Sequence, residues 1–148
     1  MFEPKNILVP TDFTDYSDTA VKFALDLARQ YGAKVNLLHV IEPVAPCTAD
    51  YCPDDSAIQT AEHLLMNHAE DKLHAELDKF YDLKGVDVSS DIREGHPGDE
   101  ILKDQEEKNI DLIVMSPHGK PGVIKRVMGT VSEKVMEEAH CPVLLVRS

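Results

Sequence analysis

The chain alternates between short strand-like segments and longer segments with helical periodicity, and this alternation constrains the fold more than any other feature. The strand-like segments span residues 6–10, 34–41, 86–92, 111–115 and 142–146. Between them, apolar side chains recur at every third or fourth position, the spacing of one helix face. Strands and helices that alternate in this way form a parallel sheet with helices on both faces.

The helical segments are predicted from their apolar stripes and end signals. The first stripe runs from Val21 to Ala28 at i, i+3, i+4 and i+7, and Gly32 follows it as a helix C-cap. Shorter helices are expected over residues 99–108 and from Thr130 onward. A helix of roughly 25 residues is predicted from a longer stripe, which comprises Ile58, Ala61, Leu65, Ala69, Leu73, Leu77 and Phe80.

The strand order follows from the two edge strands. Residues 86–92 alternate apolar and polar side chains, which is typical of a half-exposed edge strand, and the last strand begins with Pro142, another edge signal. With right-handed crossovers, these edges favour the order 3-2-1-4-5. We therefore predict a single domain over residues 1–148, a three-layer, Rossmann-like α/β sandwich. A long irregular loop is expected over residues 42–56.

The last strand is strongly apolar for an edge strand. An uncovered apolar edge promotes aggregation, so we expect this edge to pair with a second copy of the chain. The predicted homodimer contact comprises Val143, Leu144, Leu145 and Val146.

Charge and composition exclude several classes of partner. The net charge is −12, with 43% hydrophobic and 28% charged residues. An acidic protein lacks the excess of Lys and Arg that nucleic acid or an anionic membrane surface requires. No apolar run reaches the ~18 residues of a membrane span, and no signal-peptide pattern is visible. We therefore expect a cytoplasmic protein whose three cysteines are free thiols.

A glycine-spaced loop follows the fourth strand. It reads Met115-Ser116-Pro117-His118-Gly119-Lys120-Pro121-Gly122, and Gly129-Thr130 precedes the last helix. The sequence Thr130-Val131-Ser132-Glu133 fits a capping box, in which the Thr130 hydroxyl caps the helix and Glu133 reaches back. Backbone N–H groups at such a helix start attract an anion. The only acid among residues 116–134 is Glu133, against Lys120, Lys125, Arg126 and Lys134.

The predicted topology brings this loop to a second polar stretch. Strand direction along the order reverses between the first and fourth strands, and ligands of such sheets bind outside the carboxyl ends at that point. Pro10, Thr11 and Asp12 follow the first strand there and would face Met115 and the glycine loop. Two separate stretches thus indicate one crevice.

With these residues identified, the chain resembles the universal stress protein family over essentially its whole length. The resemblance is carried by residues 7–12 (ILVPTD), 38–43 (LHVIEP), 111–115 (DLIVM), 129–135 (GTVSEKV) and 140–146 (HCPVLLV). Nucleotide-binding members of the family have the pattern G-x2-G-x9-G-[S/T]. Here its second glycine is Gly119 and its last pair is Gly129-Thr130, but its first glycine is replaced by Ser116.

The resemblance implies an adenine nucleotide, ATP or AMP, in the crevice. Val40 would contact adenine through its backbone, beside Pro10, Thr11 and Asp12. Ribose would lie near Met115 and Ser116, with Asp12 as a candidate ligand for Mg²⁺ held with the phosphates. The remaining implied contacts are Pro117, His118, Gly119, Lys120, Pro121, Gly122, Gly129, Thr130 and Val131.

Three hypotheses about function stay open. The first is a universal stress protein that binds ATP or AMP and changes its partner interactions in a stress response. The second is a dimer of the same fold whose crevice is closed by Ser116 and Pro117, where Pro117 also removes one N–H donor. The third is a slow, Mg²⁺-dependent ATPase that uses Asp12. No motif for efficient catalysis is visible, so we expect no catalytic residues and at most slow hydrolysis.

Overall fold

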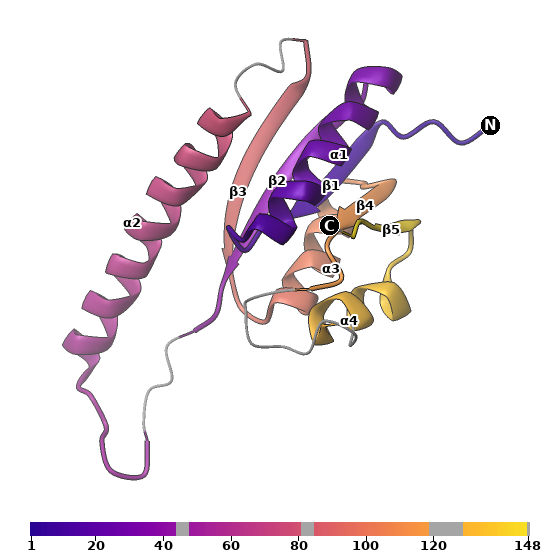
Figure 1. Ribbon diagram of the computed structural model, residues 1–148. Helices are drawn as coiled ribbons and strands as arrows, with labels where there is room; N and C mark the ends of the chain where they lie inside the picture. The colour runs from indigo at the N-terminus through magenta and orange to yellow at the C-terminus, as the bar shows by residue number, and fades with distance from the viewer. Residues whose placement is uncertain (44–47, 81–84, 119–128, 148) are drawn as a thin grey trace.

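The computed structural model describes residues 1–43, 48–80, 85–118 and 129–147. Its strands form one parallel sheet in the order β3-β2-β1-β4-β5, with helices on both faces (Figure 1), so the predicted order 3-2-1-4-5 is confirmed. The strands are β1 Asn6–Pro10, β2 Lys34–Ile41, β3 Asp87–Glu94, β4 Leu112–Met115 and β5 Val143–Leu145. The helices are α1 Asp15–Tyr31, α2 Asp55–Lys79, α3 Pro97–Glu107 and α4 Thr130–Glu138.

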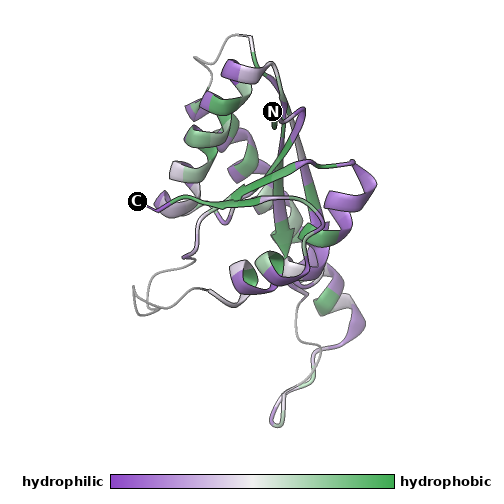
Figure 2. Ribbon diagram, turned by 90° about the vertical axis from the view of Figure 1, so that its right-hand side faces the viewer, coloured by the Kyte–Doolittle hydropathy of each residue, from purple (hydrophilic) through white to green (hydrophobic). Residues whose placement is uncertain are grey.

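The core consists of two apolar layers, one on each face of the sheet. Ile7 and Val9 face the layer formed with α1 and the C-terminal part of α2, whereas Leu8 faces the layer formed with α3 and α4. All three side chains are fully buried, which explains why the central strand is continuously apolar. In Figure 2 the apolar residues accordingly follow the strands, whereas the helices combine apolar and polar faces.

Helix α1 ends where the sequence predicts, at Gly32. Thr14 is its N-cap and accepts a hydrogen bond from the Ser17 amide. Gly32 ends it in the left-handed region, with φ of 67°, a conformation that costs glycine little because it has no Cβ. The buried stripe between these caps packs on β1, β2 and β4.

Helix α2 is packed over only part of its length. Among its described residues, Ala69, Leu73 and Glu76 are buried, whereas Leu65 is exposed. The predicted stripe was therefore wrong for the first half of the helix, where none of residues 55–68 is buried. Figure 1 shows this half extending past the end of the sheet.

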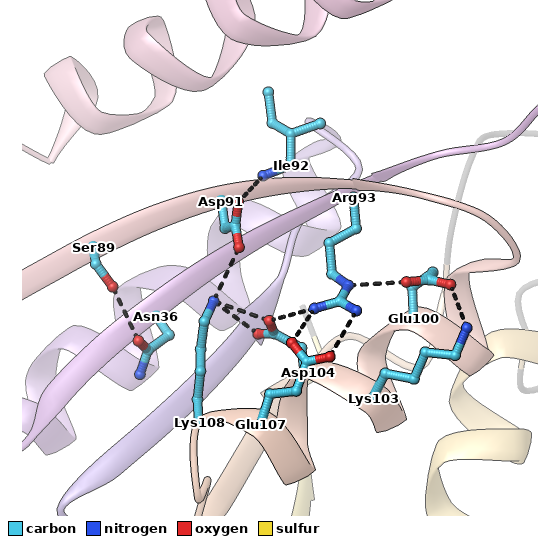
Figure 3. A network of polar contacts seen from close by, with 10 residues as sticks. All are labelled: Asn36, Ser89, Asp91, Ile92, Arg93, Glu100, Lys103, Asp104, Glu107 and Lys108. Atoms are coloured by element: carbon cyan, nitrogen blue, oxygen red, sulfur yellow. Dashed lines mark hydrogen bonds and ion pairs between the residues drawn. The ribbon is translucent and has the colours of Figure 1, made fainter.

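An ion-pair network fastens α3 beneath the edge strand β3 (Figure 3). The Arg93 guanidinium donates to Glu100 Oε2 at 2.9 Å, to Asp104 Oδ1 at 3.3 Å and to Glu107 Oε2 at 2.8 Å. Asp104 is fully buried and also pairs with Lys108 at 2.9 Å. These contacts raise the pKa of Arg93 and lower the pKa values of Glu100 and Glu107, so all three groups are charged at neutral pH.

Two expectations about local structure are corrected. The N-cap of α4 is Gly129, and no side chain caps this helix, so the predicted capping box is absent. Instead, the Ser132 hydroxyl donates to backbone carbonyls, including that of Gly129 at 2.9 Å. Cys141 is a free thiol, whereas Cys52 is disulfide-bonded, so the expectation of free thiols is wrong for Cys52.

Within the described ranges, no helix combines the length and the apolar character needed to span a membrane.

Candidate functional site

The carboxyl ends of β1 and β4 lie side by side, as the topology predicts. Ile7 pairs with Leu112 and Leu8 with Ile113, so Pro10 and Met115 end adjacent strands at the same edge of the sheet. Val40, Met115 and Val131 belong to one apolar cluster beneath this edge. The fold therefore brings together residues that are far apart in the chain.

The backbone of Val40 points toward the space beyond the end of β1. Along β2, Lys34 donates to β1 and Leu38 accepts from Thr11 at 2.8 Å, whereas Ile41 accepts from Gly95 on the opposite side. Because backbone groups of alternate residues face opposite neighbours, the Val40 N–H and C=O face the β1 side. Strand β1 ends at Pro10, so this position lies past its last residue.

Asp12 acts as a local cap in the turn that follows β1. Its Oδ1 atom accepts from both the amide and the hydroxyl of Thr14, the latter a short contact. One carboxylate oxygen is thus used to hold the turn, and Oδ2 is the oxygen that remains for the predicted Mg²⁺. Among the described residues, this turn offers a metal one carboxylate oxygen, and the bound nucleotide would supply further ligands.

Thr11 is the most densely bonded residue of this turn. Its hydroxyl lies 3.1 Å from the Ser17 hydroxyl and donates to Glu76 Oε1 at 3.3 Å, and it accepts from the Phe13 amide at 3.1 Å. Its carbonyl lies 2.8 Å from His39 Nδ1. The Thr11 side chain is buried and therefore fixes the turn without facing the crevice.

Phe13 adopts an unusual backbone conformation beside these groups. Its φ of 64° is rare for a bulky residue. Contacts of the Phe13 ring offset this backbone strain. The ring lies against His39, at a centroid distance of 4.3 Å, and the Lys72 ammonium lies 5.7 Å from its centre. Such strain is found where the surrounding structure imposes a conformation, often near functional sites.

On the β4 side, Pro117 and Gly129 are joined directly. The Gly129 amide donates to the Pro117 carbonyl at 2.8 Å, and the Ser132 hydroxyl donates to the same carbonyl at 3.2 Å. The Gly129 N–H is therefore engaged within the protein, contrary to the expectation that it is presented to a ligand. The first amide of α4 with a helical partner is that of Glu133, which donates to the Gly129 carbonyl, so the amides of Thr130, Val131 and Ser132 precede the helical ladder.

His118 connects the two sides of the crevice. Its ring lies 5.8 Å from that of Tyr16, in the first turn of α1, with an edge-on geometry. The His118 amide donates to the Ser116 hydroxyl at 3.2 Å. Ser116 and His118 are half-buried and Pro117 is buried, so the start of the loop packs on the domain.

Part of the predicted site lies outside the described residues. This holds for Gly119, Lys120, Pro121 and Gly122, and also for Lys125 and Arg126. The remaining cation of the predicted basic segment, Lys134, is paired with Asp99 at 3.0 Å and Glu138 at 3.4 Å. Lys134 is thus committed to neighbouring acids.

The sequence reasoning missed three residues at this edge: Tyr16, His39 and Glu76. The first two lack a motif that would single them out. Glu76, however, lies between Leu73 and Leu77 on the apolar stripe of α2, and a carboxyl group at such a position is a signal of a special environment.

The comparisons with known proteins agree with this architecture. The model of the universal stress protein family matches residues 3–147. A universal stress protein of Methanocaldococcus jannaschii is 34% identical over 143 residues, which cover 97% of this chain and 82% of the relative.

Solved structures with the same fold extend this result. A universal stress protein from Lactobacillus plantarum aligns with a TM-score of 0.85 at 24% identity, over 99% of this chain and all of that one. A universal stress protein in complex with cAMP gives 0.71 at 22%, over 99% and 98%. An Arabidopsis thaliana family member with AMP bound gives 0.64 at 21%, over 97% and 91%. The match over nearly the whole chain shows that this protein belongs to the universal stress protein family.

Proposed function

We propose that this universal stress protein binds an adenine nucleotide, ATP or AMP, outside the carboxyl ends of β1 and β4, and that the bound nucleotide changes its interactions in a stress response. The observation that carries the proposal is the position of Val40. Its backbone N–H and C=O face the space beyond β1, where they would pair with the edge of adenine. Family members with AMP and cAMP bound support the ligand class.

The phosphates would bind at the start of α4. The amides of Thr130 and Val131 precede the helical ladder, and the helix N-terminus contributes about half a positive charge. Because the Gly129 amide is engaged by Pro117, Gly129 would contribute mainly by its small size. A Cβ atom at this position would lie 3.3 Å from the Pro117 carbonyl oxygen.

Calorimetric titration with ATP, ADP and AMP tests the proposal. Gly129→Val is expected to abolish binding, since the added side chain would displace the Pro117–Gly129 contact and fill the space beside the phosphates. Thr130→Val removes one exposed hydroxyl and is expected to weaken ATP more than AMP. Thr60→Val makes the same change on the exposed face of α2 and should leave both unchanged. The absence of heat at millimolar nucleotide with the wild-type protein would refute the proposal.

One observation favours a second function, a dimeric protein of the same fold without nucleotide. The Gly129 amide is used within the protein, and Pro117 offers no N–H. Mass spectrometry of small molecules released from freshly purified protein separates the two candidates. A dimer from which no nucleotide is released would support the second.

Slow ATP hydrolysis with Mg²⁺ at Asp12 is a further extension of the nucleotide proposal. Only Asp12 Oδ2 is left for a metal, because Oδ1 holds Thr14. In single-turnover assays, Asp12→Asn is expected to remove any hydrolysis that belongs to this protein. Activity that persists unchanged would indicate a contaminating enzyme.

A further inference from the structure

Two acidic side chains meet in the corner where α1, α2 and the end of β1 join. Glu76 of α2 is only 2% exposed, and the Asp18 carboxylate of α1 lies beside its carboxyl group. Lys79 lies 3.1 Å from Asp18 Oδ2 and 3.7 Å from Glu76 Oε2, at the outer side of the pair. Thr11 approaches from the β1 side and donates to Glu76 Oε1.

If both acids are ionised, one buried carboxylate oxygen in this corner lacks a hydrogen-bond donor. Asp18 Oδ1 is buried, and no group in the described part of the chain donates to it. Two carboxylates have only acceptors, so neither can satisfy the other, whereas a protonated carboxyl group supplies an O–H donor. A proton on Glu76 would give Asp18 Oδ1 the donor that it lacks and remove the cost of an unpaired buried acceptor.

Burial and the charge of Asp18 also favour a proton on Glu76. Burial, and after it the adjacent Asp18, raise the pKa of Glu76 from 4.5 to about 7, against smaller opposing effects of Lys79 and Thr11. The nearby acid Asp15 on α1 acts on Lys79. Thr11 and Ser17 bring hydroxyl groups to this corner, not charges.

We propose that Asp18 and Glu76 hold one proton between them in the folded protein, and that this shared proton fastens α2 to the corner that carries Thr11. Helix α2 is buried only in its C-terminal half, so this contact acts together with the packing of Leu73 and Leu77 to attach it. Loss of the proton places two negative charges side by side and weakens the docking of α2. The Thr11–Thr14 turn loosens with it, because Thr11 is bonded to Glu76.

The direction of the pH dependence follows from linkage. Glu76 has a higher pKa in the folded protein than its ordinary value of 4.5, so the folded state binds the proton more tightly. The stabilisation is complete below 4.5 and is lost as the pH rises through about 7. The unfolding equilibrium constant is expected to increase on the order of a few hundredfold across this window, at one tenfold step per pKa unit.

Carboxyl ¹³C NMR of the full chain tests the shared proton without any substitution. Glu76 is expected to titrate near 7. Hydrogen exchange of the amides in residues 69–79 is expected to accelerate over the same pH range. A Glu76 midpoint in the ordinary glutamate range would overturn the proposal.

A substitution at Glu76 separates the effect of its proton from the effect of its side-chain packing. Glu76→Gln places an amide donor where the proton would be, so its exchange rates and stability should no longer change between 4.5 and 7 beyond the general effect of pH on exchange chemistry. Glu70→Gln makes the same change at an exposed position of α2 and should behave like wild type. If Glu76→Gln keeps the full pH dependence of the wild type, the proposal is wrong.

Discussion

At the scale of single residues, the turn after β1 depends on one hydroxyl group. Thr11 accepts from Phe13, contacts Ser17 and donates to Glu76. Each of these bonds is worth roughly 1 kcal/mol net, and more when a buried partner is left unsatisfied. The side chain that determines the shape of the candidate site is therefore buried behind it.

Thr11→Val should destabilise the protein by about 2–3 kcal/mol, because it keeps the shape of the side chain and removes all three hydrogen bonds. Urea denaturation measures the loss. Thr19→Val is the matched control, since the Thr19 hydroxyl bonds to the Asp15 carbonyl on the exposed side of α1. Equal effects of the two substitutions would contradict the importance given to Thr11.

Asp111 fastens the N-terminal segment to the start of β4. Its carboxylate accepts from the Lys5 amide at 2.9 Å and from the Asn6 amide at 3.2 Å. Asp111→Ala should cost roughly 1–3 kcal/mol, since these bonds are charge-assisted. Asp111→Asn, which keeps one acceptor, should lose less in thermal or urea unfolding. A larger loss in the Asn variant would show that the carboxylate acts in another way.

Local residue patterns correctly predicted the end of α1 but not the N-terminal cap of α4. Gly32 was predictable because a left-handed cap has few alternatives to glycine. The Thr130 capping box failed because Ser132 and Gly129 form hydrogen bonds with Pro117, a partner 12 or more positions earlier in the chain. Local sequence does not contain that contact.

At the scale of elements, the edge strand β3 pairs with β2 along its whole length and is held to α3 by charge. Its side chains are largely exposed, and Arg93 connects it to three acids on α3. The exposed Glu107 contributes little to stability. The buried Asp104 carries most of the dependence on Arg93, because removal of one partner leaves its charge less compensated.

Arg93→Ala should therefore destabilise the protein by about 3 kcal/mol at neutral pH. Arg93→Lys should lose less but still be measurable, because an ammonium cannot bridge three carboxylates as a guanidinium does. Calorimetric unfolding of the three proteins provides the comparison. A neutral Arg93→Ala would show that the network is not stabilising.

The same network predicts an acid dependence. Arg93 lowers the pKa of Glu100, so this contribution to stability is present above the ordinary value of 4.5 and is lost as the pH falls through the lower, folded-state pKa. The difference in stability between wild type and Arg93→Ala is expected to shrink below 4.5. A difference that is constant across that range would contradict the assignment.

Element type and order were predictable because period and caps are local properties. The extent of packing was not. The stripe of α2 continues through Ile58, Ala61 and Leu65, yet only its second half meets the sheet. A stripe shows which face would be buried, but the length of the surface beneath it is set by other parts of the chain.

At the scale of the whole molecule, we propose that β5 pairs two copies of the chain. Its apolar residues are only half-buried. The Pro142 carbonyl and the Val146 amide bond to β4, so by alternation the backbone groups of Leu145 face outward. The outer edge of β5 is therefore available to a second strand.

Leu145→Pro should convert a dimer to a monomer, because it removes an outward N–H while sparing the bonds to β4. Sedimentation velocity across a concentration series measures the change. Leu144→Pro, which would remove an inward N–H, should instead destabilise the fold. A wild-type protein that is monomeric at all concentrations would contradict the proposed pairing.

The first half of α2, which extends past the end of the sheet, has a consequence for how the sequence of such a protein evolves. Because residues 55–68 contribute no buried side chain to the domain, substitutions there are nearly neutral for folding as long as the helix persists. The side chains on that surface can therefore change during evolution without compensating substitutions elsewhere in the domain. Divergence among relatives should therefore be greatest where the helix leaves the sheet and smallest around Leu73 and Glu76.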